Sequence, residues 1–267
     1  LILFIYKYYS VIFNKTDFNL LVPLGLSFII FSAISYIVDI YRNNSDNNLI
    51  DTFMYFTFFP KVVSGPIILW KDFSKEIKNR KHTREKFIDG INLMVIGFSK
   101  KVILADTFGS IVLLIREWIN SGVDVLTAIG LVILYSVQIY YDFSGYSDIA
   151  IGLSKMFGLD FKDNFNHPYT ANSITDFWRR WHISLGNWFK EYVYIPLGGN
   201  RKGKRRILIN LMIVFILTGI WHGAGWNYLV WGILHGIIRI IEKCLENNKI
   251  YQKIPNIFKR VITIIFV

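Results

Sequence analysis

The chain has 267 residues, of which 53% are hydrophobic and 18% charged, with a net charge of +11. Soluble domains average about 25% charged residues, so this composition excludes an ordinary soluble domain and predicts a polytopic α-helical membrane protein. The apolar runs are long and continuous, which excludes a β-barrel. We expect the positive charge to lie in cytoplasmic loops, not to bind nucleic acid. The single cysteine, Cys244, excludes an internal disulfide and a cysteine-based metal site.

Both ends of the sequence lie inside apolar runs. Leu1 opens one such run and Val267 closes another, and the start lacks the basic region and cleavage site of a signal peptide. No internal repeat divides the chain. We therefore expect one membrane domain over residues 1–267, as a fragment of a longer protein that is truncated at both ends.

The first third of the chain holds one complete span and one broken span. Residues 19–38 carry no charge, which is typical of a membrane helix. Residues 53–69 are apolar but contain Pro60 and Pro66, so we expect a broken or re-entrant segment that is buried in protein or lines a cavity. Residues 70–86 hold seven basic and three acidic side chains, which indicates a cytoplasmic loop or surface helix.

The middle of the chain alternates apolar and polar stretches. Residues 87–106 are mostly apolar, and residues 125–141 are charge-free, so we expect a span there that ends at Asp142. The overlapping stretch 140–148 is dense in hydroxyls and carboxylates, and a short apolar run follows it at 149–157.

An amphipathic helix is predicted over residues 176–194, after a loop at 164–175 in which Ser173 or Thr175 could cap it. It is too charged to span a membrane, and His182 lies on its aromatic face. A histidine there could equally be a core residue. The aromatic face contains Trp178, Trp181, His182, Leu185, Trp188, Phe189 and Tyr192.

The charge-free stretch 207–238 contains His222 and His235 and follows a basic run at 201–206. That basic run should keep the start of the span on the cytoplasmic side. A straight helix would carry His222 about 22 Å into a core of about 30 Å, past its midplane. A titratable group at that depth is a functional-site hypothesis, although a histidine bonded to a neighbouring helix is the alternative. Glycines at 223–225 should break the helix just after it.

The sequence lacks the motifs of several well-known enzyme classes. It has no serine-hydrolase elbow, zinc-protease motif or phosphate loop. Residues 196–206 match a turn and a cytoplasmic anchor better than a phosphate site. Asp142 and Asp148 have no histidine near them in sequence, so we expect no metal site.

Two histidines in aromatic settings, His182 and His222, therefore carry the chemistry. A neutral histidine can accept a proton from a hydroxyl as a general base, which suits acyl transfer to an alcohol. The second histidine, or an amide such as Asn187 or Asn227, could orient the acceptor or stabilise an oxyanion.

Four motifs carry a resemblance to a known family. The chain reads DFWRRWHISLGNW and YIPLGGNRKG within residues 176–203, YYDFSGYSD at 140–148, GIWHGA at 219–224, and FFP then SGPI within 58–67. Together they resemble the membrane-bound O-acyltransferase (MBOAT) family, and within it the bacterial alginate O-acetylation branch. The resemblance covers about residues 20–240.

The resemblance implies an all-α, polytopic bundle of membrane helices, with re-entrant and amphipathic helices around a tunnel. It implies that His222 is catalytic and that His182 lies beside the same tunnel, so we predict one cavity wall shared by both. The further candidates for tunnel or substrate contacts are Asp142, Ser144, Tyr146, Asp176, Trp178, Trp181, Asn187, Trp221 and Asn227.

The resemblance also implies the reaction and its setting. Acetyl-CoA or a similar acyl donor would enter from the cytoplasm as a substrate, with no bound cofactor and no metal. The acyl group would leave on the outer face, through an SGNH-type acyltransferase partner that acts on a polysaccharide. The expected location is the bacterial cytoplasmic (inner) membrane, as a multi-pass protein in contact with membrane lipids.

Other functions stay open at this point. A D-alanyl transfer protein for teichoic acid belongs to the same family, although the PLGGN turn at 196–200 favours the alginate branch. A transporter with proton-relay histidines should show paired broken helices, whereas only 53–69 is broken here. A membrane scaffold is the third alternative, and the dense polar motifs argue against it. We also predict that 70–86 and 201–206 share the cytoplasmic side.

Overall fold

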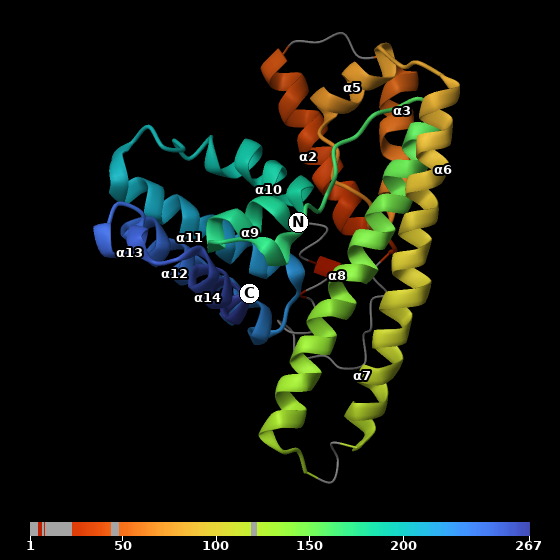
Figure 1. Ribbon diagram of the computed structural model, residues 1–267. Helices are drawn as coiled ribbons and strands as arrows, with labels where there is room; N and C mark the ends of the chain where they lie inside the picture. Colours follow the sequence, from red (N-terminus) through yellow and green to blue (C-terminus); the bar gives the residue numbers. More distant parts are fainter. Residues whose placement is uncertain (1–4, 7, 9–22, 44–47, 119–121) are drawn as a thin grey trace. The chain divides into compact units, whose positions relative to one another are not determined.

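The regular structure of the protein is helical, as the composition predicted (Figure 1). The computed structural model describes residues 5, 6, 8, 23–43, 48–118 and 122–267, and it has no β-strand in these ranges. The chain divides into two units, which are described separately below. Unit 1 comprises Leu1–Phe56, Leu69–Lys71 and Phe165–Val267, and unit 2 comprises Thr57–Ile68 and Asp72–Asn164. The single domain expected from the sequence stays a prediction.

Two of the described helices are long and apolar enough to cross a membrane. They are α8 (Val125–Met156) in unit 2 and α11 (Gly203–His222) in unit 1. The span predicted at 19–38 corresponds in part to α2 (Leu26–Asn43), while residues 19–22 lie outside the described residues.

Unit 1 is built around a cluster of large aromatic side chains. Phe31 of α2 lies 4.3 Å from Trp188 and 5.3 Å from Trp221, measured between ring centroids. The Trp188 indole N–H donates to the carbonyl of Phe31 at 3.1 Å. The other helices of this unit are α3 (Leu49–Thr57), η3 (Pro168–Thr170), α9 (Ile174–Arg180), α10 (Ile183–Phe189), η4 (Lys190–Tyr194), α12 (Trp226–Leu245), α13 (Lys249–Lys253) and α14 (Asn256–Phe266).

A buried hydrogen-bond network ties η4 to α2. The Tyr192 hydroxyl donates to Asp39 at 2.8 Å and lies 2.7 Å from the Ser35 hydroxyl. The backbone amides of Trp70 and Lys71 donate to Ser35 and Asp39 respectively, at 2.8 and 3.0 Å. Because buried polar groups need such partners, this network fixes η4, a short π-helix, against α2.

Helices α11 and α12 form a hairpin whose backbones approach closely at two glycines. A Cβ atom at Gly219 would lie 2.5 Å from the Tyr228 carbonyl oxygen, and one at Gly232 would lie 2.6 Å from the Phe215 carbonyl oxygen. Only glycine allows this separation, as in other tightly packed membrane helices. The helix break predicted at 223–225 is confirmed, since α11 ends at His222 and α12 begins at Trp226.

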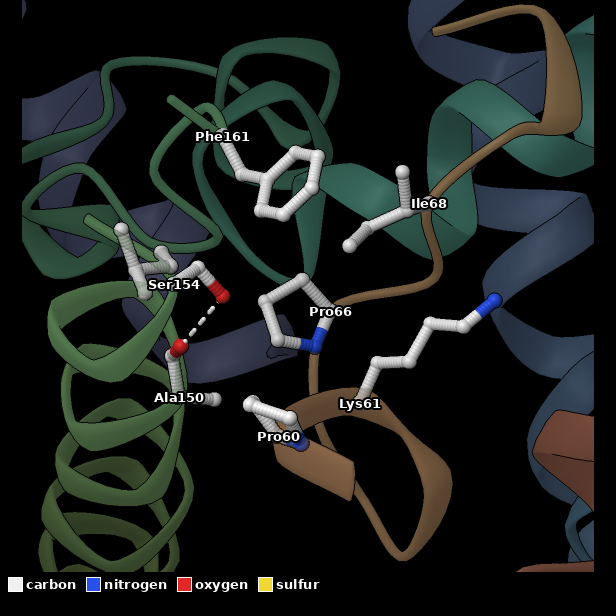
Figure 2. A pocket seen from close by; sticks show the side chains of 8 residues that line it. Pro60, Lys61, Pro66, Ile68, Ala150, Ser154 and Phe161 are labelled. Carbon is white, nitrogen blue, oxygen red and sulfur yellow. Dashed lines mark hydrogen bonds between the residues drawn. The ribbon is translucent and has the colours of Figure 1, made fainter. Parts of the chain in front are cut away.

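Unit 2 contains the proline-rich segment that the sequence predicted to be broken. Its short helix α4 (Phe59–Val62) is followed by extended chain, and residues 65–70 are buried. Pro60, Pro66 and Phe161 line a small hollow against α8, in which Ser154 donates to the Ala150 carbonyl at 2.7 Å (Figure 2). The predicted break of the segment 53–69 is confirmed, and burial holds for its last part, residues 65–69, whereas Phe53 and Phe59 are exposed.

A continuous helical rod runs alongside α8 in unit 2 (Figure 1). The rod consists of α6 (Arg84–Phe98), η1 (Ser99–Ala105) and α7 (Asp106–Trp118), and it is preceded by α5 (Trp70–Lys78). Gly90 meets Gly152, and Gly97, seven residues later on α6, meets Gly145, seven residues earlier on α8. A Cβ atom on either glycine of α6 would lie 2.6 Å from an α8 carbonyl oxygen.

The helix that contains the predicted span at 125–141 continues beyond Asp142, because α8 runs without interruption from Val125 to Met156. Its two carboxylates find partners within unit 2. Lys101 pairs with Asp142 at 2.6 Å, and Lys100 pairs with Asp148 at 2.5 Å. Since these ion pairs satisfy the carboxylates, charge in this stretch does not end the helix.

Candidate functional site

His222 is the last residue of α11, at the point where the hairpin turns. A Cβ atom on the next residue, Gly223, would lie 2.4 Å from the Tyr228 ring, so glycine is needed for the turn to close. The Tyr8 hydroxyl donates to the Gly223 carbonyl oxygen at 3.0 Å and also to that of Ile220. Carbonyls at a helix end lack partners within the helix, so these bonds help to hold the end of α11 in place.

Aromatic rings surround the His222 imidazole. Its centroid lies 4.6 Å from that of Trp221, 5.1 Å from that of Trp231 and 6.3 Å from that of Tyr228. The histidine is nevertheless exposed at the surface of the described chain. An exposed imidazole held by rings can meet a substrate, which is what the proposed base requires.

His182 lies in a sharp turn between α9 and α10, not on a continuous helix. The single helix predicted over 176–194 is therefore wrong: α9 ends at Arg180, and His182 has a left-handed backbone with φ of 45°. A left-handed residue cannot continue a right-handed helix. The Arg180 carbonyl accepts instead from the amide of Asn166 at 2.9 Å, which stabilises the break. The expected cap at Ser173 is confirmed, because its side chain accepts from the Asp176 amide.

The His182 imidazole is buried and uncharged. Its ring stacks on Phe165 at 6.4 Å, and its Nδ1 atom lies 3.4 Å from the Ser184 hydroxyl. Burial, with a smaller contribution from the charge of His222, lowers the pKa of His182 to about 3. The two histidines are thus close enough to interact electrostatically. A cavity wall shared by them stays a prediction.

His235 lies on α12, one helical turn after Trp231, and is buried among aromatic rings. Its centroid lies 4.8 Å from that of Trp231 and 5.3 Å from that of Trp178. Within the described part of the chain, His235 Nδ1 and Trp178 Nε1 have no hydrogen-bond partner. Trp231, which touches both His222 and His235, was missed by the sequence analysis. Its place one helical turn before His235 is the signal that could have indicated it.

The other predicted site residues of unit 1 differ in their surroundings. Trp181 packs against Phe165 at 5.2 Å and so supports the His182 turn. Asp176 forms an ion pair with Arg180 at 2.8 Å. Asn187 and Asn227 are exposed. Their contacts with a substrate stay predictions.

Three predicted site residues belong to α8 in unit 2. Asp142 is paired with Lys101, which also reaches Asp106 at 2.9 Å. Ser144 is fully buried, and its hydroxyl has no hydrogen-bond partner among the described residues. Tyr146 is partly buried. Among the residues that the structure describes, no group of three His, Cys, Asp or Glu side chains could hold a metal ion.

The class of protein follows from comparison with known families. The family model described as MBOAT, membrane-bound O-acyltransferase family, matches residues 37–248. This range contains α11, α12 and all three of His182, His222 and His235. The chain belongs to the membrane-bound O-acyltransferase family.

Individual relatives show which members of this family the chain resembles. The chain is 44% identical to "Probable alginate O-acetylase AlgI" of Pseudomonas fluorescens, over 86% of this chain and 46% of the relative. It is 33% identical to "Peptidoglycan O-acetyltransferase" of Helicobacter pylori, over 93% of this chain and 53% of the relative. It is 31% identical to "Teichoic acid D-alanyltransferase" of Streptococcus thermophilus, over 86% of this chain and 59% of the relative. The chain thus spans about half the length of these curated relatives.

Proposed function

We propose that the chain forms the acyl-transferring part of a membrane O-acyltransferase. It moves an acyl group, here acetyl, from a cytoplasmic donor across the membrane for O-acetylation of an extracytoplasmic polysaccharide. The observation that carries this proposal is the position of His222, an exposed imidazole held among three aromatic rings at a glycine-broken helix end.

In the proposed reaction, His222 acts as the general base. It takes the proton from an acceptor hydroxyl while the hydroxyl oxygen attacks the acyl carbonyl carbon. The carbon–sulfur bond of a thioester donor such as acetyl-CoA then breaks, and the proton passes from His222 to the thiolate. His182 is neutral because burial lowers its pKa. A neutral imidazole has one N–H group, which can donate to the oxyanion or orient the acceptor.

The relatives support acetyl over D-alanyl as the transferred group. The relatives named as alginate O-acetylases reach 44% identity, whereas those named as teichoic acid D-alanyltransferases reach 31%. We also propose that it is a multi-pass protein of the bacterial cytoplasmic membrane, because its family is membrane-bound and α8 and α11 are long and apolar enough to span. An SGNH-type acyltransferase is the proposed partner on the outer face.

The test supplies membranes that contain the intact protein with either radiolabelled acetyl-CoA or a radiolabelled D-alanyl carrier. We expect label in the polysaccharide only from acetyl-CoA, and no label with His222→Gln. Label from the D-alanyl carrier alone would replace acetyl by D-alanyl. Equal labelling by the wild type and His222→Gln would overturn the role of His222.

A further inference from the structure

Glu242 of α12 reaches across unit 1 to the start of α9. We propose that Glu242 is a positioning residue for the acyl transfer, because its carboxylate holds α9 in place and so sets the turn that presents His182. This inference rests on the proposed function of the two histidines.

The contacts of Glu242 are made by a nearly buried carboxylate, 8% exposed. One of its oxygens accepts from the Ile174 amide at 2.8 Å, and the other accepts from the Thr175 amide at 2.8 Å. The Thr175 hydroxyl also donates to the second oxygen. Three donors from α9 therefore converge on one side chain that lies 67 and 68 residues away in sequence.

These contacts complete the capping of α9. The first amides of a helix have no partner within it, and most helices rely on a side chain just before the first turn. Here Ser173 accepts from the Asp176 amide at 3.0 Å, and Glu242 takes the two amides before that. A shift of α9 away from α12 would leave the buried carboxylate with Arg239 at 3.5 Å and without its three donors from α9, which is costly. Glu242 therefore fixes where α9 begins.

The position of α9 matters because the helix has only seven residues and ends two residues before His182. A displacement at its start is therefore carried to the His182 turn. A second contact fixes the same pair of helices, since Trp178 of α9 lies 5.8 Å from Trp231 of α12. Trp231 itself touches His222 at 5.1 Å.

The same face of α12 thus contacts both His222 and the helix α9 that leads to His182. Trp231 and Glu242 are eleven residues apart, about three helical turns, so they lie on the same face. At one end of this face Trp231 packs on His222, and at the other Glu242 holds the helix that leads to His182. Because both contacts belong to α12, this helix relates the position of the His182 imidazole to that of the His222 imidazole.

The main test is Glu242→Gln in the intact membrane protein. Glutamine keeps the shape but presents an NH2 group to one of the two amide donors, so α9 should shift. We expect kcat per inserted molecule to fall about tenfold with KM for acetyl-CoA unchanged, since small misplacements of catalytic groups reduce rate strongly. Glu246→Gln is the matched control, because Glu246 lies on the turn after α12 and pairs only locally with Lys243 at 2.5 Å.

A second pair of variants covers the case in which Glu242→Gln fails to insert. Thr175→Val removes one of the three donors while keeping the side-chain shape, and Thr175→Ser keeps that donor. We expect Thr175→Val to lower kcat about threefold and Thr175→Ser to restore it. Equal kcat for Val and Ser at this position would overturn the inference.

A double variant separates positioning from mere stability. If Glu242 acts through His182, then Glu242→Gln lowers kcat no further in a His182→Ala background. A full additional tenfold loss there, or a loss of inserted protein with unchanged kcat, would overturn the positioning role. Failure of the proposed function would look different, because the wild type would then lack acyl transfer or His222→Gln would retain it.

Discussion

Two helix pairs of the described chain, one in each unit, share one packing device and differ in their polar groups. In unit 1, α11 and α12 meet at Gly219 and Gly232, and in unit 2, α6 and α8 meet at glycines in the same way. On the hairpin of unit 1, the titratable His222 and His235 lie among aromatic rings. On the pair of unit 2, the two carboxylates of α8 each pair with a lysine.

This difference indicates a division of roles. Ion pairs such as Lys100 with Asp148 neutralise charge and fix the rod against α8, which leaves little chemistry available. The exposed His222 imidazole, held among aromatic rings, can instead meet a substrate and accept its proton, as a general base does. We therefore interpret the α6–α8 pair as a support and the α11–α12 hairpin as the reactive part.

The largest expected effect concerns the proposed general base, His222, on the α11–α12 hairpin. His222→Gln should lower acyl transfer by about 10²–10⁴-fold, the usual loss on removing a general base. His235→Gln should mainly reduce the amount of inserted protein, because His235 is buried among rings and packs the hairpin. The measurement is acetyl incorporation into the polysaccharide, normalised to inserted protein. Similar normalised activities for the two variants would contradict the assignment of His222.

The next largest effect concerns the close packing of α6 against α8. A Cβ atom at Gly152 would lie 2.6 Å from the Gly90 carbonyl oxygen, so Gly152→Ala should destabilise the protein by about 1–3 kcal/mol. Gly130 lies on the same helix with open space around it, and Gly130→Ala should be stabilising by up to about 1 kcal/mol. Thermal unfolding in detergent compares the two. Equal melting temperatures would show that the close contact is not needed.

A pH series sharpens the electrostatic side of the comparison. His182 lies in a turn outside both candidate spans, and burial lowers its pKa from 6.5 to about 3. Below pH 6.5 the unfolded chain binds a proton that the folded chain does not, so stability should fall as pH decreases through this window. The expected loss is about 1.5 kcal/mol between pH 6.5 and about pH 5.

The control for the pH series uses a second histidine with the same backbone. His182→Asn should flatten the stability loss, and asparagine tolerates the left-handed backbone at φ of 45°. His167 has φ of 44° and is exposed, so His167→Asn should leave the slope unchanged. Parallel slopes for the wild type and both variants would show that His182 is not held uncharged by burial.

The smallest effect concerns Ser144 on α8. Its hydroxyl is fully buried and has no hydrogen-bond partner among the described residues, which costs about 1–3 kcal/mol. Ser144→Ala should therefore raise stability by about 1 kcal/mol while leaving acyl transfer per folded molecule unchanged. A stable variant with reduced transfer would instead support the predicted substrate contact at Ser144.

Patterns of apolar and polar residues were sufficient for the helical class, the broken segment at 53–69 and the break after His222. Each of these depends on local information: charge-free length, proline or glycine at a given position. The same information did not show that the helix continues past Asp142, whose carboxylate pairs with a lysine. Lys101 meets it from η1, 41 residues earlier in the chain.

By itself the sequence determined that helices form, where glycine and proline interrupt them, and that His182 and His222 lie in aromatic settings. Only the tertiary structure decided that residues 176–194 break at His182 and that Trp231 packs on His222. It also decided that Glu242 caps α9. The physical reason is that helical periodicity reports which face of a segment is apolar, whereas a backbone break is stabilised by partners from distant parts of the chain. The amide of Asn166 and the carboxylate of Glu242 are such partners, and their positions depend on how the chain crosses itself.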